Sequence, residues 1–295
     1  MKRLVSIVAA LLAALPSFAA TVAVDASEAR RGIFHTAVMM PVKDGPFTFV
    51  YPKWVPGEHT PTGPLMQVVG LHVRAGGREI AWTRDPVDLF AFHVDVPAGA
   101  DAIDVAFDYL SPSSTFGAGY GESSNATQNL LLLLFNHVVV YPAGARSDDV
   151  PFKASVRLPS GWKFDCALPV EKREGDLIEF KTVSLTTLID SPLVAGAFMR
   201  VVPVGDNGRE HVTITADSAS ALAMTDARIA NVASLVTEAD ALFGARHYRA
   251  YTWLVTLSDL IEPQGLEHHE STDIRYGERG LTDPDTTARS ITILS

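Results

Sequence analysis

Proline is concentrated in the first third of the chain, where it restricts which elements can form. Eight of the 18 prolines lie between Pro41 and Pro97. A proline inside a helix removes a backbone hydrogen bond and clashes with the preceding turn, so this spacing argues against long helices there. The region is therefore expected to fold as short strands joined by turns.

Short strand patterns run from residue 21 to about residue 204. Alternation of apolar and polar residues, or enrichment in β-branched and aromatic residues, marks segments 47–51, 71–74, 92–96, 103–109 and 154–158. Glycine and proline separate these segments, as is typical of turns. Many short strands at this spacing predict a mostly β, sandwich-like N-terminal domain over residues 20–204.

Two further details of this domain follow from the sequence. The apolar run at 130–135, continued at 138–141, is interrupted by Asn136 and His137 and predicts a buried strand or strand pair. The single cysteine, Cys166, is expected in a turn; it excludes an internal disulfide and any multi-cysteine zinc or iron–sulfur site.

The pattern changes near residue 205, where a second domain of mixed α+β type is predicted. A strand at 211–215 is followed by a helix and then by a strong strand at 251–257. Asp217 or Ser218 can cap the helix, and Gly244 can end it in the left-handed conformation. The apolar stripe of this helix consists of Leu222, Ile229, Val232, Val236, Ala239 and Phe243.

The second domain, residues 205–295, is predicted to be incomplete. About 90 residues holding one helix and a few strands are few for a domain of this kind. Segment 290–295 also has the pattern of a new apolar element that begins where the sequence ends.

The first 19 residues have the layout of a secretory signal peptide. Lys2 and Arg3 precede an apolar run at 4–15, and small residues stand at 17 and 19, before the expected cleavage site. The run is shorter than the roughly 20 residues of a membrane span. The mature protein is therefore expected to be exported, periplasmic or secreted, with no membrane attachment after cleavage.

The charge balance argues against nucleic-acid binding. The chain has 24 Lys and Arg against 34 Asp and Glu, a formal charge of −10. Affinity for a phosphate backbone needs clustered basic residues, and the sequence has no such cluster.

The densest group of polar and ionisable residues lies at 265–273, with the sequence G-L-E-H-H-E-S-T-D. In an extended segment, Glu267 and His269 would face one side and His268 and Glu270 the other. His269 and Glu270 begin a possible H-E-x-x-H zinc motif, but Asp273 stands where its second histidine would be. The sequence therefore assigns no metal ligand and no catalytic residue here, and a solvated strand end is the structural alternative.

Two segments resemble the M61 metallo-aminopeptidases, the glycyl aminopeptidase family. Y-P-K-W-V-P-G-E-H at 51–59 is similar to the family pattern P-x-W-x-P-G-x-Y, with His59 where an aromatic residue is commoner. G-L-E-H at 265–268, followed by S-T at 271–272, resembles G-G-L-E-H-x-x-S-T, with Gln264 in place of the first glycine. The resemblance extends from about residue 34 to 272. Trp54 and Pro56 are interpreted as core and turn residues.

The resemblance implies a β-rich N-terminal domain followed by an incomplete α+β domain of thermolysin-like fold. In that family the G-L-E-H segment is an edge strand lining the active cleft, so Gly265, Leu266, Glu267 and His268 are the candidate substrate-binding residues. Glu267 would bind the free α-ammonium of a peptide, and His268 would help to position the substrate. The strand backbone would pair with the peptide main chain.

The resemblance also implies a cofactor and a reaction. Zinc is expected for the full-length family member, held by an H-E-x-x-H helix that should follow the end of this sequence. The expected function is an exported, zinc-dependent aminopeptidase that cleaves N-terminal residues from peptides with a free N-terminus. This chain lacks the zinc motif, so it is expected to be inactive alone.

Two alternatives stay open from the sequence. The chain could be a non-catalytic exported β-sandwich module, a degenerate peptidase that binds peptides or a partner. An in-frame H-E-x-x-H within a few tens of codons after Ser295 would favour the enzyme, and a stop codon would favour the module. A carbohydrate-binding domain rests on the sandwich class alone.

Overall fold

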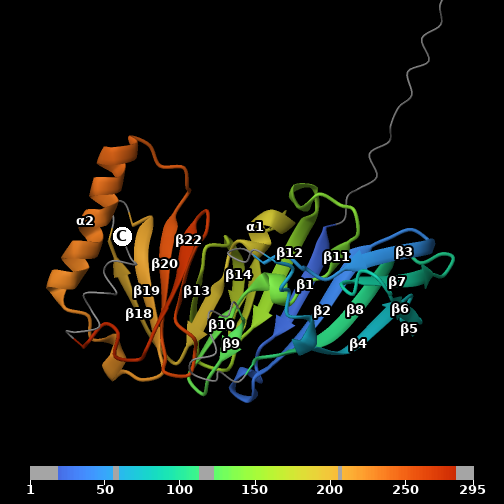
Figure 1. Cartoon of the computed structure of the whole chain (residues 1–295), viewed down its shortest axis with the longest axis horizontal. Helices are drawn as coiled ribbons and strands as arrows, with labels where there is room; N and C mark the ends of the chain where they lie inside the picture. Colours follow the sequence, from blue (N-terminus) through green and yellow to red (C-terminus); the bar gives the residue numbers. More distant parts are fainter. Residues whose placement is uncertain (1–18, 56–59, 113–122, 205–207, 284–295) are drawn as a thin grey trace, which may run out of the picture.

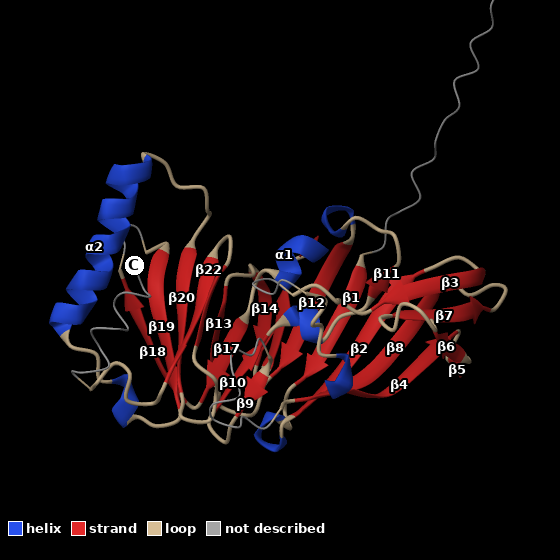
Figure 2. Ribbon diagram, in the orientation of Figure 1, coloured by secondary structure: helices blue, strands red, loops and turns tan. Residues whose placement is uncertain are grey.

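The computed structural model describes residues 19–55, 60–112, 123–204 and 208–283. Strands in four sheets dominate these residues, and the few helices lie around them (Figure 2). The mostly β prediction is therefore confirmed. Residues 1–18 of the expected signal sequence, together with Pro56, His59 and the apolar segment 290–295, lie outside the described residues.

The largest sheet has nine strands and forms one wall of the N-terminal part. Its order is β14-β15-β12-β1-β2-β8-β4-β5, with β16 paired to β12. β1 lies in the middle, antiparallel to β2 and parallel to β12, where Ala20 is the register partner of Phe152. The strands are β1 (Ala20–Asp25), β2 (Ile33–Pro41), β4 (Val68–Ala75), β5 (Arg78–Glu79), β8 (Ala102–Leu110), β12 (Pro151–Arg157), β14 (Val170–Glu174), β15 (Leu177–Phe180) and β16 (Val183–Ser184).

Two four-stranded sheets share a hydrophobic core with the nine-stranded sheet. Phe34 and Met40 of β2 are fully buried in one cluster with Phe49, Phe92 and Leu131. One small sheet has the order β13-β17-β10-β9, and the other has the order β11-β3-β7-β6. Their strands are β3 (Gly45–Val50), β6 (Trp82–Arg84), β7 (Ala91–Val96), β9 (Asn125–Ala126), β10 (Leu130–Leu133), β11 (Tyr141–Pro142), β13 (Lys163–Cys166) and β17 (Leu193–Gly196).

The five predicted strands of this part are all present, as β3, β4, β7, β8 and β12. The buried strand predicted in the apolar run is present as β10. It is followed by a 3-10 helix at Phe135–His137, where the Tyr51 hydroxyl donates to the His137 carbonyl at 2.8 Å. Two details differ from the sequence expectations. Cys166 ends strand β13 instead of lying in a turn. Trp54 is 59% exposed instead of buried, because Tyr51 and Val55 occupy the core positions of that segment.

The fourth sheet has five strands and follows the first three in the chain. Its order is β18-β19-β20-β22-β21; β19, β20 and β22 are parallel, and the two edge strands run antiparallel to their neighbours. Its strands are β18 (Phe198–Pro203), β19 (Glu210–Ala216), β20 (Tyr251–Leu257), β21 (Gln264–Glu267) and β22 (Ser271–Tyr276).

The two faces of this sheet pack against different neighbours. Helix α2 (Asp226–Phe243) covers one face, where Val236 clusters with Val255 and Ile274. The opposite face contacts the N-terminal sheets, because Leu254 packs with Leu132, Val194 and neighbouring residues. Figure 1 shows the resulting order, with α2 at the outer end of the molecule and β20 and β22 between it and β13.

Helix α2 begins later than the apolar stripe predicts. Thr225 is its N-terminal cap, and Leu222 lies in a separate 3-10 helix at Ser220–Leu222. Asp217 does not cap the helix, because its carboxylate accepts hydrogen bonds from Thr127 and Ser258. Gly244 ends the helix with a φ of 66°, as predicted. None of the described helices is long and apolar enough to cross a membrane.

Candidate functional site

The G-L-E-H segment forms the edge of the five-stranded sheet. β21 pairs with β22 through Gly265↔Ile274, Leu266↔Asp273 and Glu267↔Thr272. The two strands form a tight hairpin, in which the His268 backbone N–H donates to the Ser271 carbonyl at 2.8 Å. The other edge of β21 pairs with no strand in the described part of the chain. An extended peptide could therefore hydrogen-bond to it.

Glu267 lies on the sheet face that α2 covers farther along the sheet. Its register partner is Thr272, whose own partner is Trp253, so these three residues form one row across the strands. Two strand spacings separate Glu267 from Trp253, about 10 Å. The carboxylate is exposed, and it makes no hydrogen bond or ion pair with any described residue. It is thus available to a cation from solution.

Tyr251 lies close enough to this carboxylate to respond to its charge. Burial, and then the negative charges of Glu267 and of other nearby groups, raise the pKa of Tyr251 to about 12. The ring packs edge-on against Trp253, with centroids 4.8 Å apart. Glu267 on β21 therefore lies near the aromatic side chains of Tyr251 and Trp253 on β20.

The neighbours of Glu267 alternate between the two faces of β21. Gly265 is exposed on the same face as Glu267. Gln264 and Leu266 are buried on the other face, in register with Arg275 and Asp273 of β22. The backbone of β21 is therefore held from the side of the N-terminal sheets, while the Glu267 side stays open.

His268 faces the N-terminal sheets and not the open side. Its side chain is only 2% exposed, and its Nδ1 lies 2.9 Å from Oδ1 of Asp190. The other oxygen of Asp190 accepts the backbone N–H of His269 at 2.9 Å. Burial raises the pKa of Asp190, but the hydrogen bonds from His268 and His269 outweigh it and lower the pKa overall. His268 and Glu267 thus act on opposite faces of the strand.

A second ion pair holds the tip of the hairpin. Arg249 donates to both carboxylate oxygens of Glu270 from Nε, at 2.9 and 3.1 Å, and its backbone N–H donates at 2.9 Å. The hydrogen bonds from Arg249 lower the pKa of Glu270. The backbone N–H of Thr252 also donates to the Glu270 carbonyl, at 3.2 Å. The tip is therefore fixed to β20 as well as to the N-terminal sheets.

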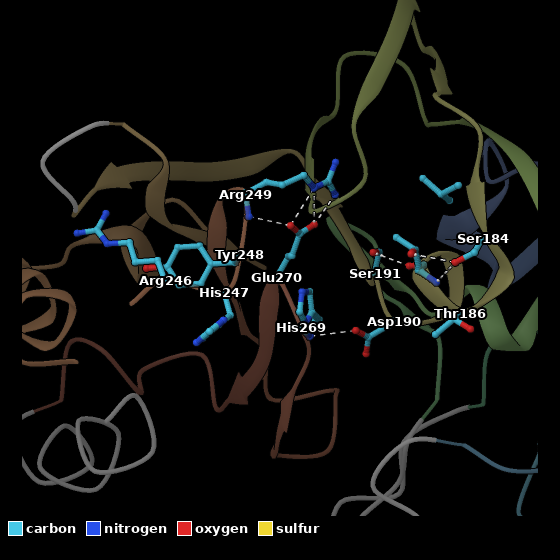
Figure 3. A pocket seen from close by; sticks show the side chains of 12 residues that line it. Ser184, Thr186, Asp190, Ser191, Arg246, His247, Tyr248, Arg249, His269 and Glu270 are labelled. Atoms are coloured by element: carbon cyan, nitrogen blue, oxygen red, sulfur yellow. Dashed lines mark hydrogen bonds and ion pairs between the residues drawn. The ribbon is translucent and has the colours of Figure 1, made fainter. Parts of the chain in front are cut away.

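A pocket of about 680 Å³ lies beside the hairpin tip, between the five-stranded sheet and the α1 segment (Leu185–Ile189). Figure 3 shows Arg249 and Glu270 on one side and Asp190 with Ser191 on the other. Its lining includes His269 and Glu270 but not Glu267. The pocket and the open face of Glu267 are therefore separate features.

The described residues supply no zinc site. In residues 19–55, 60–112, 123–204 and 208–283, no group of three or more His, Cys, Asp or Glu side chains could hold a metal ion. His268 and His269, adjacent in sequence, are directed differently, because His268 is buried against Asp190 and His269 is exposed. The zinc implied by the resemblance does not fit this part of the chain.

Sequence reasoning named the strand residues but missed the residues that hold them. Asp190 and Arg249 lie 78 and 21 residues from their partners His268 and Glu270. Neither belongs to a motif, and no periodicity connects them to the hairpin. The three-dimensional packing of the two parts of the chain brings them together.

Comparison with known proteins identifies the N-terminal part. A model of the peptidase M61 N-terminal domain matches residues 21–197. No curated protein matches the chain.

Several solved structures are similar in fold. An aminopeptidase N family protein from Idiomarina loihiensis has a TM-score of 0.72 at 14% identity, over 90% of this chain and 43% of that one. A mutant M1 zinc metallopeptidase from Deinococcus radiodurans, bound to a Tyr-Ser-Ala substrate, has a TM-score of 0.51 at 12% identity, over 92% and 62%. Yeast LTA4 hydrolase in complex with bestatin has a TM-score of 0.52 at 11% identity, over 94% and 43%. The chain thus spans between 43% and 62% of the length of these structures.

Proposed function

The chain belongs to the peptidase M61 family, since its match to the N-terminal domain covers more than half of its residues, and on that premise we propose that it is the substrate-recognising part of an exported, zinc-dependent aminopeptidase. The proposed substrate is a peptide with a free N-terminus, from which terminal residues are removed. The proposal assigns bond cleavage and zinc binding to none of the described residues. Export rests on the first 19 residues of the sequence.

The unpartnered carboxylate of Glu267 carries this proposal. It is exposed beside an open strand edge and makes no ion pair with the described residues. A peptide that pairs with the free edge of β21 makes main-chain hydrogen bonds to that strand. Its terminal ammonium can then reach the Glu267 carboxylate. A charge-assisted hydrogen bond between carboxylate and ammonium would fix where the peptide begins. The M1 metallopeptidase bound to a tripeptide is a fold relative, which supports a peptide as the ligand.

The other candidate residues contribute through the backbone in this proposal. Gly265 and Glu267 offer their main-chain groups at the free edge, because the His268–Ser271 bond sets the alternation of the antiparallel pair. Leu266 faces β22 with its main chain, and its buried side chain anchors the strand. His268 faces away from the open side, so it would position the substrate by holding the strand and not by touching the peptide. The recognition site is thus one carboxylate on a fixed strand.

Glu267→Gln tests the proposal directly in this chain. The probes are alanyl-alanine amide and its N-acetylated form, titrated into the protein by NMR. Removal of the charge should weaken binding of the free-amine peptide roughly tenfold or more, since hydrogen bonds to charged groups contribute about 1.5–3 kcal/mol. Binding of the acetylated peptide should stay unchanged, because it has no ammonium to lose.

The matched control is Glu238→Gln, which makes the same charge change at an exposed position on α2. It should leave both affinities as in the wild type. Equal losses for the two peptides in Glu267→Gln would remove Glu267 from the proposed role.

A further inference from the structure

Asp190 joins the β21–β22 hairpin to the N-terminal sheets with both of its carboxylate oxygens. Oδ1 lies 2.9 Å from His268 Nδ1, and Oδ2 accepts the His269 backbone N–H at 2.9 Å. An ionised carboxylate only accepts hydrogen bonds, so His268 Nδ1 must be the donor. Because one bond holds a side chain and the other holds the main chain, the pair fixes both the position and the twist of the strand end.

Asp190 is itself held rigidly. It ends helix α1, and its backbone N–H donates to the Thr186 carbonyl at 3.1 Å. Leu185 and Leu188 of this helix are buried in the N-terminal core, and the Ser184 hydroxyl accepts the Thr187 backbone N–H at the other end. The helix that precedes this carboxylate is therefore anchored in the N-terminal core, while the residues that the carboxylate holds belong to the β21–β22 hairpin.

His268 follows Glu267 directly, so a constraint on one sets the direction of the other. Adjacent strand residues point to opposite faces, and a rotation of the strand that moved His268 would swing Glu267 the other way. Glu267 has no partner of its own among the described residues to correct its orientation. The position of its carboxylate depends on its neighbours.

We propose that Asp190 is a positioning residue for peptide recognition, which acts through His268 to hold the Glu267 carboxylate where a peptide ammonium meets it. This inference rests on the proposed function of Glu267. It makes the N-terminal core a determinant of the binding geometry in the five-stranded sheet. Displacement of a binding group by about 1 Å is enough to lose most of its contribution.

Asp190→Asn is the first test, with the same two peptides. Asparagine keeps one acceptor for His268 but presents its NH2 group to the His269 N–H, so one of the two bonds is lost. The preference for the free-amine peptide over the acetylated one should fall about fivefold, the size of a coupling between packed residues. Affinity for the acetylated peptide should stay unchanged.

The matched control is Asp217→Asn. The Asp217 carboxylate also spans the two parts of the chain, through Thr127 and Ser258, but it lies past the opposite end of β20 from the hairpin. About six residues of strand separate Ser258 from Thr252, roughly 20 Å. This variant should keep the full preference for the free-amine peptide. If it loses as much preference as Asp190→Asn, then Asp190 has only a structural role.

A second pair of variants covers the case in which Asp190→Asn does not fold. His268→Gln retains a side-chain donor and should keep the preference within about twofold, whereas His268→Leu has no donor and should lose it. A His268→Leu protein with the full preference would overturn the inference.

A double variant separates this inference from the proposed function. In a Glu267→Gln background, Asp190→Asn should have no further effect on the preference, because the group that it positions is gone. If Glu267→Gln alone keeps the wild-type preference, the proposed function fails. If Glu267→Gln abolishes the preference while Asp190→Asn and His268→Leu both keep it, only the role of Asp190 fails.

Discussion

Asp165 of β13 receives three side-chain hydrogen bonds from the five-stranded sheet, all at Oδ2. The donors are His211 Nε2 at 2.7 Å, the Thr213 hydroxyl at 2.5 Å and the Thr252 hydroxyl at 2.9 Å. The Asp165 side chain is 18% exposed and that of His211 is 27% exposed, so water screens these bonds only partly. We predict that Asp165→Asn destabilises the protein and changes how its stability depends on pH.

The size of the effect follows from the three bonds. Hydrogen bonds to a charged group contribute about 1.5–3 kcal/mol and neutral ones about 0.5–1.5 kcal/mol, so each bond should lose about 1 kcal/mol. An amide is easier to bury than a carboxylate, which offsets about 1 kcal/mol of the total. The free energy of unfolding should therefore fall by about 2 kcal/mol at pH 5.5.

The pH dependence follows from the two shifted groups. The hydrogen bond to Asp165 raises the pKa of His211 above 6.5, so its contribution is complete below pH 6.5 and is lost as the pH rises through the raised value. Burial raises the pKa of Asp165, but the bonds from His211 and the threonines outweigh it and lower the pKa overall; its contribution is therefore complete above pH 3.8. Both contributions are present together between about pH 4 and 6.5.

Urea unfolding at pH 5.5 and pH 8.5 measures the prediction. The difference between wild type and Asp165→Asn should be about 1 kcal/mol smaller at pH 8.5, because neutral His211 no longer pairs with a charge. His211→Gln should show the same trend with a smaller loss, since the two threonine bonds remain. A difference that is equal at the two pH values would refute the assignment of the His211–Asp165 pair as the source.

Two further predictions concern packing and metal binding. Leu254 of β20 is fully buried against Leu132, Leu134 and Val194 of the N-terminal part and Met199 of β18. Leu254→Ala should therefore lower the free energy of unfolding by about 2–5 kcal/mol and Leu254→Met by less than about 1.5 kcal/mol, measured by urea unfolding. Equal losses would contradict a tightly packed contact between the two parts. The second prediction is that residues 20–295 bind no stoichiometric zinc and do not hydrolyse an alanyl amide, because the sequence lacks H-E-x-x-H. Elemental analysis showing one zinc per chain, together with turnover, would overturn it.

Local patterns predicted several strands, but not β1 or β2 of the largest sheet, nor the start of the helix. Segment 251–257 is rich in aromatic and β-branched residues, and it forms β20 at the predicted residues. Leu222 fits the helical spacing of α2, yet it lies before Thr225, where the helix begins. Periodicity alone does not show where a helix begins. Asp217 does not cap the helix, because it accepts hydrogen bonds from Thr127 and Ser258, which are distant in sequence.

The candidate site, like the fold, was only partly predictable from the sequence. The resemblance named Glu267 and His268, and the alternation of a strand predicted that they face opposite sides. His268 is indeed buried while Glu267 is exposed. Asp190 could not be found from sequence, because its role depends on the contact between α1 and the hairpin. Such a contact is set by tertiary packing.

The central location of β1 has a consequence for synthesis. Its partner β2 follows within a few residues, but its other partner, β12, ends at Arg157, 132 residues after the end of β1 at Asp25. At about 5–20 residues per second, roughly 7–26 s pass before β12 has been synthesised. During that interval one edge of β1 has no native neighbour, and an unpaired edge invites association with other chains. Newly made protein should therefore be most vulnerable to aggregation at β1.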